Sequence, residues 1–156
     1  MPSEPVAVRS EAVPDDVDRL LRSLPEWFGI EHSIQEYVDD ARTLPTYVVR
    51  DPDSGAVVGI LLVRRHFPAA AEVHLMAVDR SRHRRGVGRA LVEQAEADLR
   101  ADGVRFLQVK TLSESRSNEH YGRTRRFYLA LGFVPLEEFP TLWDPGNPAL
   151  MLVKAL

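Results

Sequence analysis

The segment from residue 72 to residue 91 constrains the fold more than any other part of the sequence. An apolar stretch, residues 72–79, leads through a basic loop to Gly86 and Gly88 and then into a helical pattern over residues 87–102. Glycines at such a junction let backbone N–H groups approach a ligand closely, and a helix start adds unpaired donors and a positive dipole. Five arginines lie between residues 80 and 89. The segment therefore predicts a strand, a phosphate-binding loop and a helix.

Several phosphate-binding and catalytic motifs do not fit this chain. A dinucleotide-binding loop reads G-x-G-x-x-G, but Leu91 stands at the third glycine position. The nucleotide-hydrolysing pattern G-x-x-x-x-G-K-[ST] does not occur, and neither does the serine-hydrolase pattern G-x-S-x-G. The five histidines form no H-E-x-x-H pair, so the sequence predicts no metal site.

The remaining segments predict an α/β chain with a mixed sheet. Strands are expected at residues 6–9, 46–50, 56–67, 104–111, 133–139 and 149–153, and further helices after Pro14, at 32–44 and at 120–131. An aspartate after Pro14 is expected to cap the first helix, and Gly103 and Gly132 to follow the ends of two later ones. The longest irregular stretch is expected around residues 140–148.

Length and composition predict one domain over residues 1–156. A chain of 156 residues can bury about 69 % of its surface. Its 44 % hydrophobic and 28 % charged residues are typical of a soluble globular protein. The chain has no cysteine, no apolar run long enough for a membrane helix and no signal-peptide pattern. We therefore expect a cytoplasmic protein without a membrane partner.

The net charge of −3 hides an asymmetry between the two parts of the chain. Residues 1–63 hold five Arg and twelve Asp or Glu, a net charge of −7, whereas residues 64–156 hold fifteen Lys or Arg and eleven acids, a net charge of +4. The split suggests that one part faces an anionic ligand and the other attracts a cation, although solvated surfaces would give the same split. The arginines lack interleaved aromatic residues, which argues against nucleic-acid binding.

Two ordered motifs give the chain a resemblance to the GNAT superfamily of N-acetyltransferases. Residues 83–88 are similar to the acyl-CoA signature [QR]-x-x-G-x-[GA], with His83 in place of Gln or Arg. Residues 127–133 match [FL]-Y-x-x-x-G-F at the usual separation. The resemblance covers nearly the whole chain. It implies the GNAT fold, a mixed and mostly antiparallel central sheet of about seven strands flanked by about four helices.

The resemblance also implies acetyl-CoA as the acetyl donor. Backbone groups of the strand before the loop would hold the pantetheine arm, and amides of the loop would hold the pyrophosphate. The family often has an Asn that contacts pantetheine at the position of Tyr121. In this chain Asn118 is expected to make that contact instead. The expected cosubstrate-binding residues are Met76, Ala77, Val78, His83, Arg84, Arg85, Gly86, Val87, Gly88, Arg89, Ala90, Asn118 and Tyr121.

Three side chains are candidates for the transfer chemistry. The resemblance assigns Tyr128 as the general acid, because a phenol is protonated at neutral pH and can donate to the leaving thiolate. Glu72 is the preferred base, since an acid within a strand is costly unless it faces a wet cleft, and the resemblance implies that it acts through water. His74 shares the strand face of Glu72 and is the alternative base. A backbone N–H between Met76 and Val78 would polarise the thioester carbonyl. Packing roles for these side chains remain open.

The acceptor is expected to be a primary amine of a small molecule. Aromatic side chains are expected to wall its site, and acidic side chains to attract its ammonium group. The aromatic candidates are Trp27, Phe28, Tyr37, Phe139 and Trp143, and the acidic candidates are Glu31, Asp39, Asp40, Glu137 and Glu138. Two other functions remain open: acetylation of a protein N-terminus or lysine, and noncatalytic acyl-CoA binding. The sequence also allows a homodimer.

Overall fold

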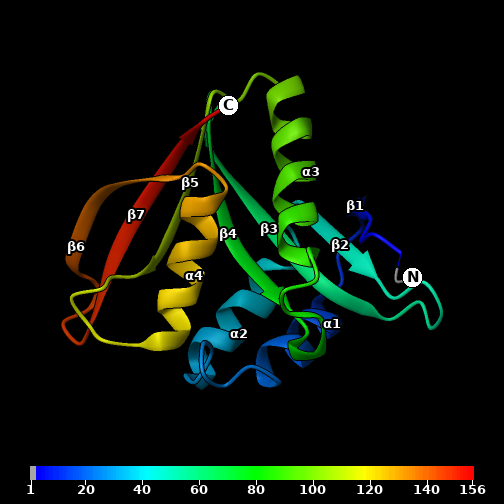
Figure 1. Cartoon of the computed structure of the whole chain (residues 1–156), viewed down its shortest axis with the longest axis horizontal. Helices are drawn as coiled ribbons and strands as arrows, with labels where there is room; N and C mark the ends of the chain where they lie inside the picture. Colours follow the sequence, from blue (N-terminus) through cyan, green and yellow to red (C-terminus); the bar gives the residue numbers. More distant parts are fainter. Residues whose placement is uncertain (1–2) are drawn as a thin grey trace.

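The computed structural model describes residues 3–156 and has seven strands and four α-helices over that range (Figure 1). The strands are β1 Ala7–Ser10, β2 Thr46–Arg50, β3 Val57–Phe67, β4 Ala70–Val78, β5 Phe106–Leu112, β6 Val134–Asp144 and β7 Asn147–Ala155. The helices are α1 Pro14–Arg22, α2 Glu31–Asp40, α3 Val87–Ala101 and α4 Glu119–Ala130, with a short 3₁₀ turn at Arg80–Arg82. Every strand and helix expected from the sequence is present, and the largest differences are the end of α2, at Asp40, and the end of β6, at Asp144.

The strands form one sheet in the order β1-β2-β3-β4-β5-β7-β6. All neighbouring strands are antiparallel except β4 and β5, which are parallel. Helices α1 and α2 cover one face of the sheet, and α3 and α4 cover the other. This arrangement confirms the predicted α/β fold with a mixed, mostly antiparallel sheet.

Strand β3 contributes to the hydrophobic clusters on both faces of the sheet. Its residues Leu61 and Val63 pack into the cluster with α3, and Ile60 and Leu62 pack into the cluster with α1 and α2. A strand covered on both faces needs apolar side chains at successive positions, which explains the uninterrupted apolar run.

A β-bulge in β4 creates the opening where the candidate site lies. Leu62 of β3 faces Leu75, but the next residue, Val63, faces Val73, so His74 is the extra residue. The parallel ladder between β4 and β5 ends at the pair Val73 and Val109. Beyond this pair both strands continue without pairing to each other. The two strands therefore diverge on the side of the bulge toward the arginine-rich loop.

Two local expectations were wrong. The first helix has Val13 as its N-cap, and Asp15 and Asp16 lie inside its first turn without a capping hydrogen bond. Pro14 opens that helix, which moves both carboxylates past the cap. Most of the stretch expected to be irregular, residues 140–148, belongs to β6 and β7. Strand β6 is an edge strand, and an edge position tolerates a proline without a ladder donor.

No helix in residues 3–156 combines the length and the apolar character needed to cross a membrane.

Candidate active site

A cavity of roughly 780 Å³ opens where β4 and β5 diverge. Its walls come from both sides of the sheet. Val87 and Tyr128 belong to the cluster with α3 and α4, whereas Leu24, Phe28 and Tyr37 pack with the opposite cluster. The cavity therefore connects the two faces of the sheet through the split between the two strands.

The loop before α3 has the backbone of an anion-binding site. Arg84 and Gly86 both have left-handed conformations, with φ of +63° and +82°. Within the described part of the chain, the N–H groups of Arg84, Arg85 and Gly86 donate to no backbone carbonyl. The first N–H groups of α3 lack intrahelical acceptors as well. Free N–H groups at a helix start, next to left-handed residues, form a concave site for phosphate.

Arginine side chains surround this end of the cavity. Arg82, Arg84 and Arg89 line it from the loop and from α3, and Arg123 and Arg126 line it from α4. Arg85 and Ala90 are not among the lining residues. Arg80 instead forms an ion pair with Glu26 at 2.6 Å, away from the lining. The positive charge near the loop thus comes from two helices and the loop together.

Gly88 permits the close packing of α3 against α4. A Cβ atom at this position would lie 3.0 Å from Cζ of Phe127 and 3.5 Å from Cε of Met76. Such a contact is tighter than ordinary van der Waals packing, so a side chain here requires Phe127 to move. The glycine therefore has a packing function in addition to the access for a ligand that the sequence indicated.

Strand β4 turns some of its backbone groups toward the cavity. The N–H of Asp79 donates to Val58 O at 2.8 Å, which makes this pair a hydrogen-bonded one. Such pairs alternate in an antiparallel ladder, so the backbone N–H and C=O of Ala77 also bond to β3. The backbone N–H and C=O of Met76 and Val78 point to the opposite edge of β4, where β5 no longer pairs with it. Ala77 therefore lines the cavity but its N–H is used within the sheet.

His83 has a partner that the sequence did not indicate. Its Nε2 donates to Val78 O at 2.8 Å, because a carbonyl only accepts. Its ring also packs edge-on against Trp27, with centroids 5.7 Å apart. The imidazole thus links the loop to the end of β4 while still lining the cavity.

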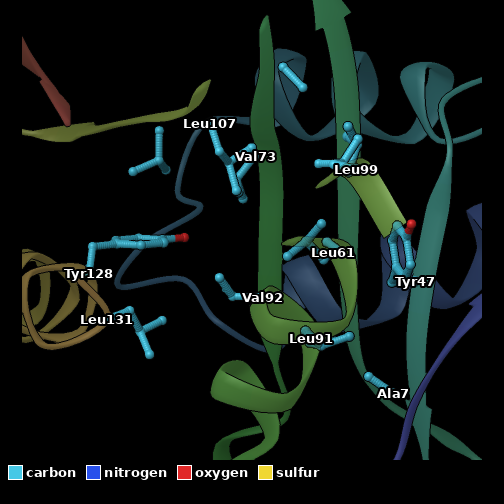
Figure 2. Packing of buried hydrophobic residues seen from close by; sticks show 14 of the residues in the cluster. Ala7, Tyr47, Leu61, Val73, Leu91, Val92, Leu99, Leu107, Tyr128 and Leu131 are labelled. Atoms are coloured by element: carbon cyan, nitrogen blue, oxygen red, sulfur yellow. The ribbon is translucent and has the colours of Figure 1, made fainter. Parts of the chain in front are cut away.

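Tyr128 lies in the cavity wall with only 3 % of its surface exposed. Figure 2 shows its ring projecting from α4 with the hydroxyl oxygen directed toward β4. Phe127 and Phe133 hold the ring by edge-on contacts, with centroids 5.0 and 5.4 Å away. Burial raises the pKa of the phenol, so the group keeps its proton at neutral pH. Nearby, Thr111 also lines the cavity, and its Oγ1 is buried without a hydrogen-bond partner.

Glu72 does not face the cavity, contrary to the sequence prediction. It is 7 % exposed and absent from the cavity lining. Its carboxylate receives bonds from Lys110 Nζ at 3.0 Å and Gln108 Nε2 at 3.3 Å, and its Oε1 lies 2.7 Å from His66 Nε2. Burial alone would raise the pKa of this carboxyl, but the bonds from His66 and Lys110 outweigh burial and lower it. The carboxylate is a buried ion-pair partner.

This lowered pKa gives a prediction about stability and pH. A carboxylate with a depressed folded-state pKa stabilises the protein above its unfolded pKa, and the contribution is lost as the pH falls through the folded value. We expect the free energy of unfolding to fall on acidification below the usual glutamate range of about 4.3. Glu72→Gln should weaken this dependence in urea unfolding at pH 7 and pH 3.5. The prediction would be contradicted if the free energy of unfolding depended on pH equally in Glu72→Gln and in the exposed control Glu114→Gln.

His74, the bulge residue, lines the cavity from the α2 side. Its Nε2 donates to Asp40 Oδ2 at 2.8 Å, and Arg64 lies 3.5 Å from the same oxygen. With Nε2 as the donor, a neutral ring leaves Nδ1 as an acceptor. The ring packs edge-on against Tyr37 at 5.5 Å. An imidazole oriented by a carboxylate can accept a proton in the cavity.

Aromatic side chains form part of the cavity wall. Trp27, Phe28, Tyr37 and Trp143 line the cavity as expected, and Phe139 does not. Trp27 joins α4 through its Nε1, which donates to Thr124 Oγ1 at 3.2 Å.

The acidic residues expected around the acceptor are elsewhere. None of them is a lining residue among those the structure describes. Glu31 pairs with Arg22 at 2.7 Å, and Asp39 pairs with Arg42 at 3.6 Å. Asp40 bonds to His74, and Glu138 bonds to Ser113 and Ser115. Glu137 is exposed on β6. These side chains bond to neighbouring groups or face solvent, and therefore do not make the cavity anionic.

Asn118 and Tyr121 have different positions from each other. Asn118 caps α4: its Oδ1 accepts from the N–H groups of His120 and Tyr121 at 3.0 and 3.2 Å, and it is absent from the lining. Tyr121 lines the cavity and donates its hydroxyl to Trp27 O at 2.7 Å. Burial raises the pKa of Tyr121 to about 12. Asn118 therefore stabilises the helix start and does not reach the cavity through Oδ1.

Lys110 and Thr111 are among the lining residues that were not identified as candidates from the sequence. The signal for Lys110 was a charged residue in a strand whose alternate positions, Leu107 and Val109, are apolar. In residues 3–156, no three His, Cys, Asp or Glu side chains are grouped in a way that suits a metal ion.

A curated relative resembles part of this chain. Mycothiol acetyltransferase from Beutenbergia cavernae is 30 % identical over 90 residues, which make up 58 % of this chain. The match covers only 28 % of that protein's length.

Solved structures resemble the whole fold. A GNAT-family protein from Desulfovibrio desulfuricans has a TM-score of 0.78 at 22 % identity, with 97 % of this chain and 98 % of that chain covered. A GNAT-family acetyltransferase from Elizabethkingia anophelis, solved with acetyl-CoA bound, has a TM-score of 0.73 at 15 % identity, with 99 % and 100 % covered. At these identities the likeness concerns the fold.

The family model described as an acetyltransferase (GNAT) domain matches residues 43–135. This range is more than half of the chain and contains β4, the glycine loop, α3 and Tyr128. The divergent strands, the anion-binding loop and the two sequence motifs all lie within it. The chain therefore belongs to the GNAT acetyltransferase domain family.

Proposed function

We propose that this chain, working as one domain, transfers an acetyl group from acetyl-CoA to a primary amine of a small molecule. One observation carries the proposal: a single cavity joins the anion-binding loop to Tyr128 on one side of the sheet and to His74 on the other. A cosubstrate with phosphates and a thioester fits one end, and an amine fits the other. The GNAT-family structure with acetyl-CoA bound supports the choice of donor.

The pyrophosphate of acetyl-CoA would bind the N–H groups between Arg84 and Gly88, with the surrounding arginines as counter-charges. The pantetheine arm would then follow the open edge of β4. There, the N–H groups of Met76 and Val78 and the C=O group of Met76 are the available backbone partners, because Val78 O already accepts from His83. Thr111 Oγ1 offers one further polar contact from β5. This placement brings the thioester to the split between the strands, close to Tyr128.

The transfer is a direct attack. The amine nitrogen bonds to the thioester carbon and loses a proton to Nδ1 of His74, directly or through water. A β4 N–H stabilises the negative charge that develops on the carbonyl oxygen. The C–S bond then breaks, and Tyr128 donates its proton to the thiolate sulfur. Amide and free coenzyme A thiol are the products.

His74 is a better base than Glu72 in this arrangement. The His74 ring lines the cavity and is oriented by Asp40, whereas the Glu72 carboxylate is outside it and bound by three partners. A carboxylate whose pKa is lowered by those partners is also a weaker proton acceptor. Asp40 acts here as a positioning residue.

A thiol-release assay with acetyl-CoA tests the proposal. The panel should contain small primary amines, a peptide with a free N-terminus and a peptide with an internal lysine. Release with small amines supports the proposal. Release with the peptides alone supports protein acetylation. Acetyl-CoA binding without release in any arm supports a noncatalytic domain.

Cosubstrate binding is expected to depend strongly on Gly88. Its Cβ position is already crowded by Phe127, so Gly88→Val should displace the start of α3 and fill the approach to the loop. We expect this variant to weaken acetyl-CoA binding in calorimetry far more than Arg80→Ala does. Arg80 pairs with Glu26 outside the cavity and is the control. Unchanged affinity in Gly88→Val would place the pyrophosphate elsewhere.

A further inference from the structure

The chain has only two lysines, and both bind a buried glutamate. Lys110 Nζ lies 3.0 Å from Glu72 Oε2, and Lys154 Nζ lies 2.9 Å from Glu96 Oε2. Both glutamates are almost fully buried. Of the two lysines, Lys110 lines the cavity and Lys154 does not. The two pairs are therefore similar in chemistry and differ in their access to the site.

Lys110 is held on the side of the sheet where the acceptor would enter. Leu107 and Val109 pack into the cluster with α3 and α4, so the alternate residues Gln108 and Lys110 point to the α2 side. His74, with its bond to Asp40 of α2, lies on the same side. The Lys110 side chain keeps 21 % of its surface exposed. Glu72, fixed by His66 and Gln108, anchors the lysine at the cavity wall.

The ammonium group of Lys110 has N–H donors that are not used in hydrogen bonds within residues 3–156. A lysine offers three N–H donors, and in residues 3–156 only the bond to Glu72 is formed. No carboxylate lines the cavity among the described residues, so nothing there would favour a second cationic group on the acceptor. Phe28 and Tyr37 provide apolar surface on the same side, and Trp143 of β6 also lines the cavity. The site combines apolar walls with one anchored cation.

We propose that Lys110 selects acceptor amines that also carry a carboxylate, in the manner of an amino acid with an apolar side chain. The inference rests on the proposed function and specifies its substrate class. The acceptor carboxylate binds the free donors of Lys110, its apolar part contacts the aromatic wall, and its amine faces His74. A charge-assisted bond of this kind raises the specificity constant about 10- to 100-fold. Lys110 is a specificity-determining residue in this scheme.

Matched acceptors test the proposal. Phenylalanine and phenethylamine differ by the carboxylate, and so do leucine and isoamylamine. We expect kcat/KM to favour the amino acid in each pair at least about tenfold, mainly through KM. Lys110→Met should abolish the preference, and Lys110→Arg should retain much of it. Equal or better use of the plain amines by the native protein would overturn the proposal.

Controls separate specificity from folding. Lys110→Met leaves the buried Glu72 without its lysine, so the double variant Lys110→Met with Glu72→Gln removes both charges and should also lose the preference. The matched control is Lys154→Met with Glu96→Gln, which removes the other pair and should keep the preference. If the preference persists without Lys110, or disappears in the Lys154 control, the assignment is wrong.

A binding measurement separates this inference from the proposed function. Calorimetric titration of phenylalanine and phenethylamine into the protein with coenzyme A reports selection without turnover. Absence of thiol release with every amine would refute the proposed function. Tighter binding of phenylalanine that is lost in Lys110→Met would still support the selective site, and equal binding of both ligands would refute it.

Discussion

Tyr128→Phe is expected to lower turnover about 10²- to 10⁴-fold with little change in acetyl-CoA affinity. The substitution keeps the ring that packs between Phe127 and Phe133 and removes only the hydroxyl. Burial raises the pKa of this phenol and keeps it protonated, so it can donate to the leaving thiolate. Without the donor, the thiolate must leave as an anion in a partly apolar cavity, which is slow. Turnover and calorimetric affinity measured together separate this effect from binding.

The matched control is Tyr47→Phe. Tyr47 is also buried, and burial raises its pKa to about 12, but its hydroxyl donates to Asp98 at 2.9 Å outside the cavity. Figure 2 shows Tyr47 and Tyr128 at opposite ends of the same packed cluster. The Tyr47 variant should lose some stability and keep its turnover. Full turnover in Tyr128→Phe would reduce that tyrosine to a packing residue.

Local motifs predicted those parts of the site that depend on neighbours in sequence. The glycine loop and the start of α3 are contiguous, so the pattern of Gly86 and Gly88 is enough to indicate them. Short apolar runs likewise predicted the strands, and apolar residues at helical spacing predicted the helices. Tyr128 was found because its motif places it four residues before Gly132, in the last turn of α4.

Contacts between distant segments were not predictable in the same way. Glu72 was placed in a wet cleft because its partners, His66 on β3 and Lys110 on β5, are not adjacent in sequence. The bulge at His74 depends on the register between β3 and β4, which no single-strand pattern reveals. Asp40 is 34 residues from His74, and the sequence indicates it only as an acid that attracts the acceptor's ammonium group. In the sequence alone, an acid that forms a buried ion pair cannot be told from an exposed acid, because the pairing of the strands is not known.

Loss of the His74 imidazole is expected to change the pH dependence of kcat/KM. An acceptor amine is mostly ammonium at neutral pH, so without a base the rate climbs only toward the amine's own pKa. With His74 as the base, the kcat/KM profile of the native protein should have an ascending limb below that pKa. His74→Gln should abolish this limb and lower kcat/KM about 10²- to 10⁴-fold near neutral pH. Rates measured across the pH range for one amine decide the matter.

Two further variants assign the roles within this cluster. Asp40→Asn keeps the imidazole but removes the carboxylate that orients Nε2, so the limb should persist at a shifted position with a smaller loss of kcat/KM. Glu72→Gln should keep the limb where it is, because the carboxylate is outside the cavity and bound to Lys110. Its effect should appear in stability and acceptor preference. The opposite result, in which Glu72→Gln removes the limb and His74→Gln leaves it intact, would make Glu72 the base, acting through water. The cavity would then have to extend past Lys110 to reach the Glu72 carboxylate.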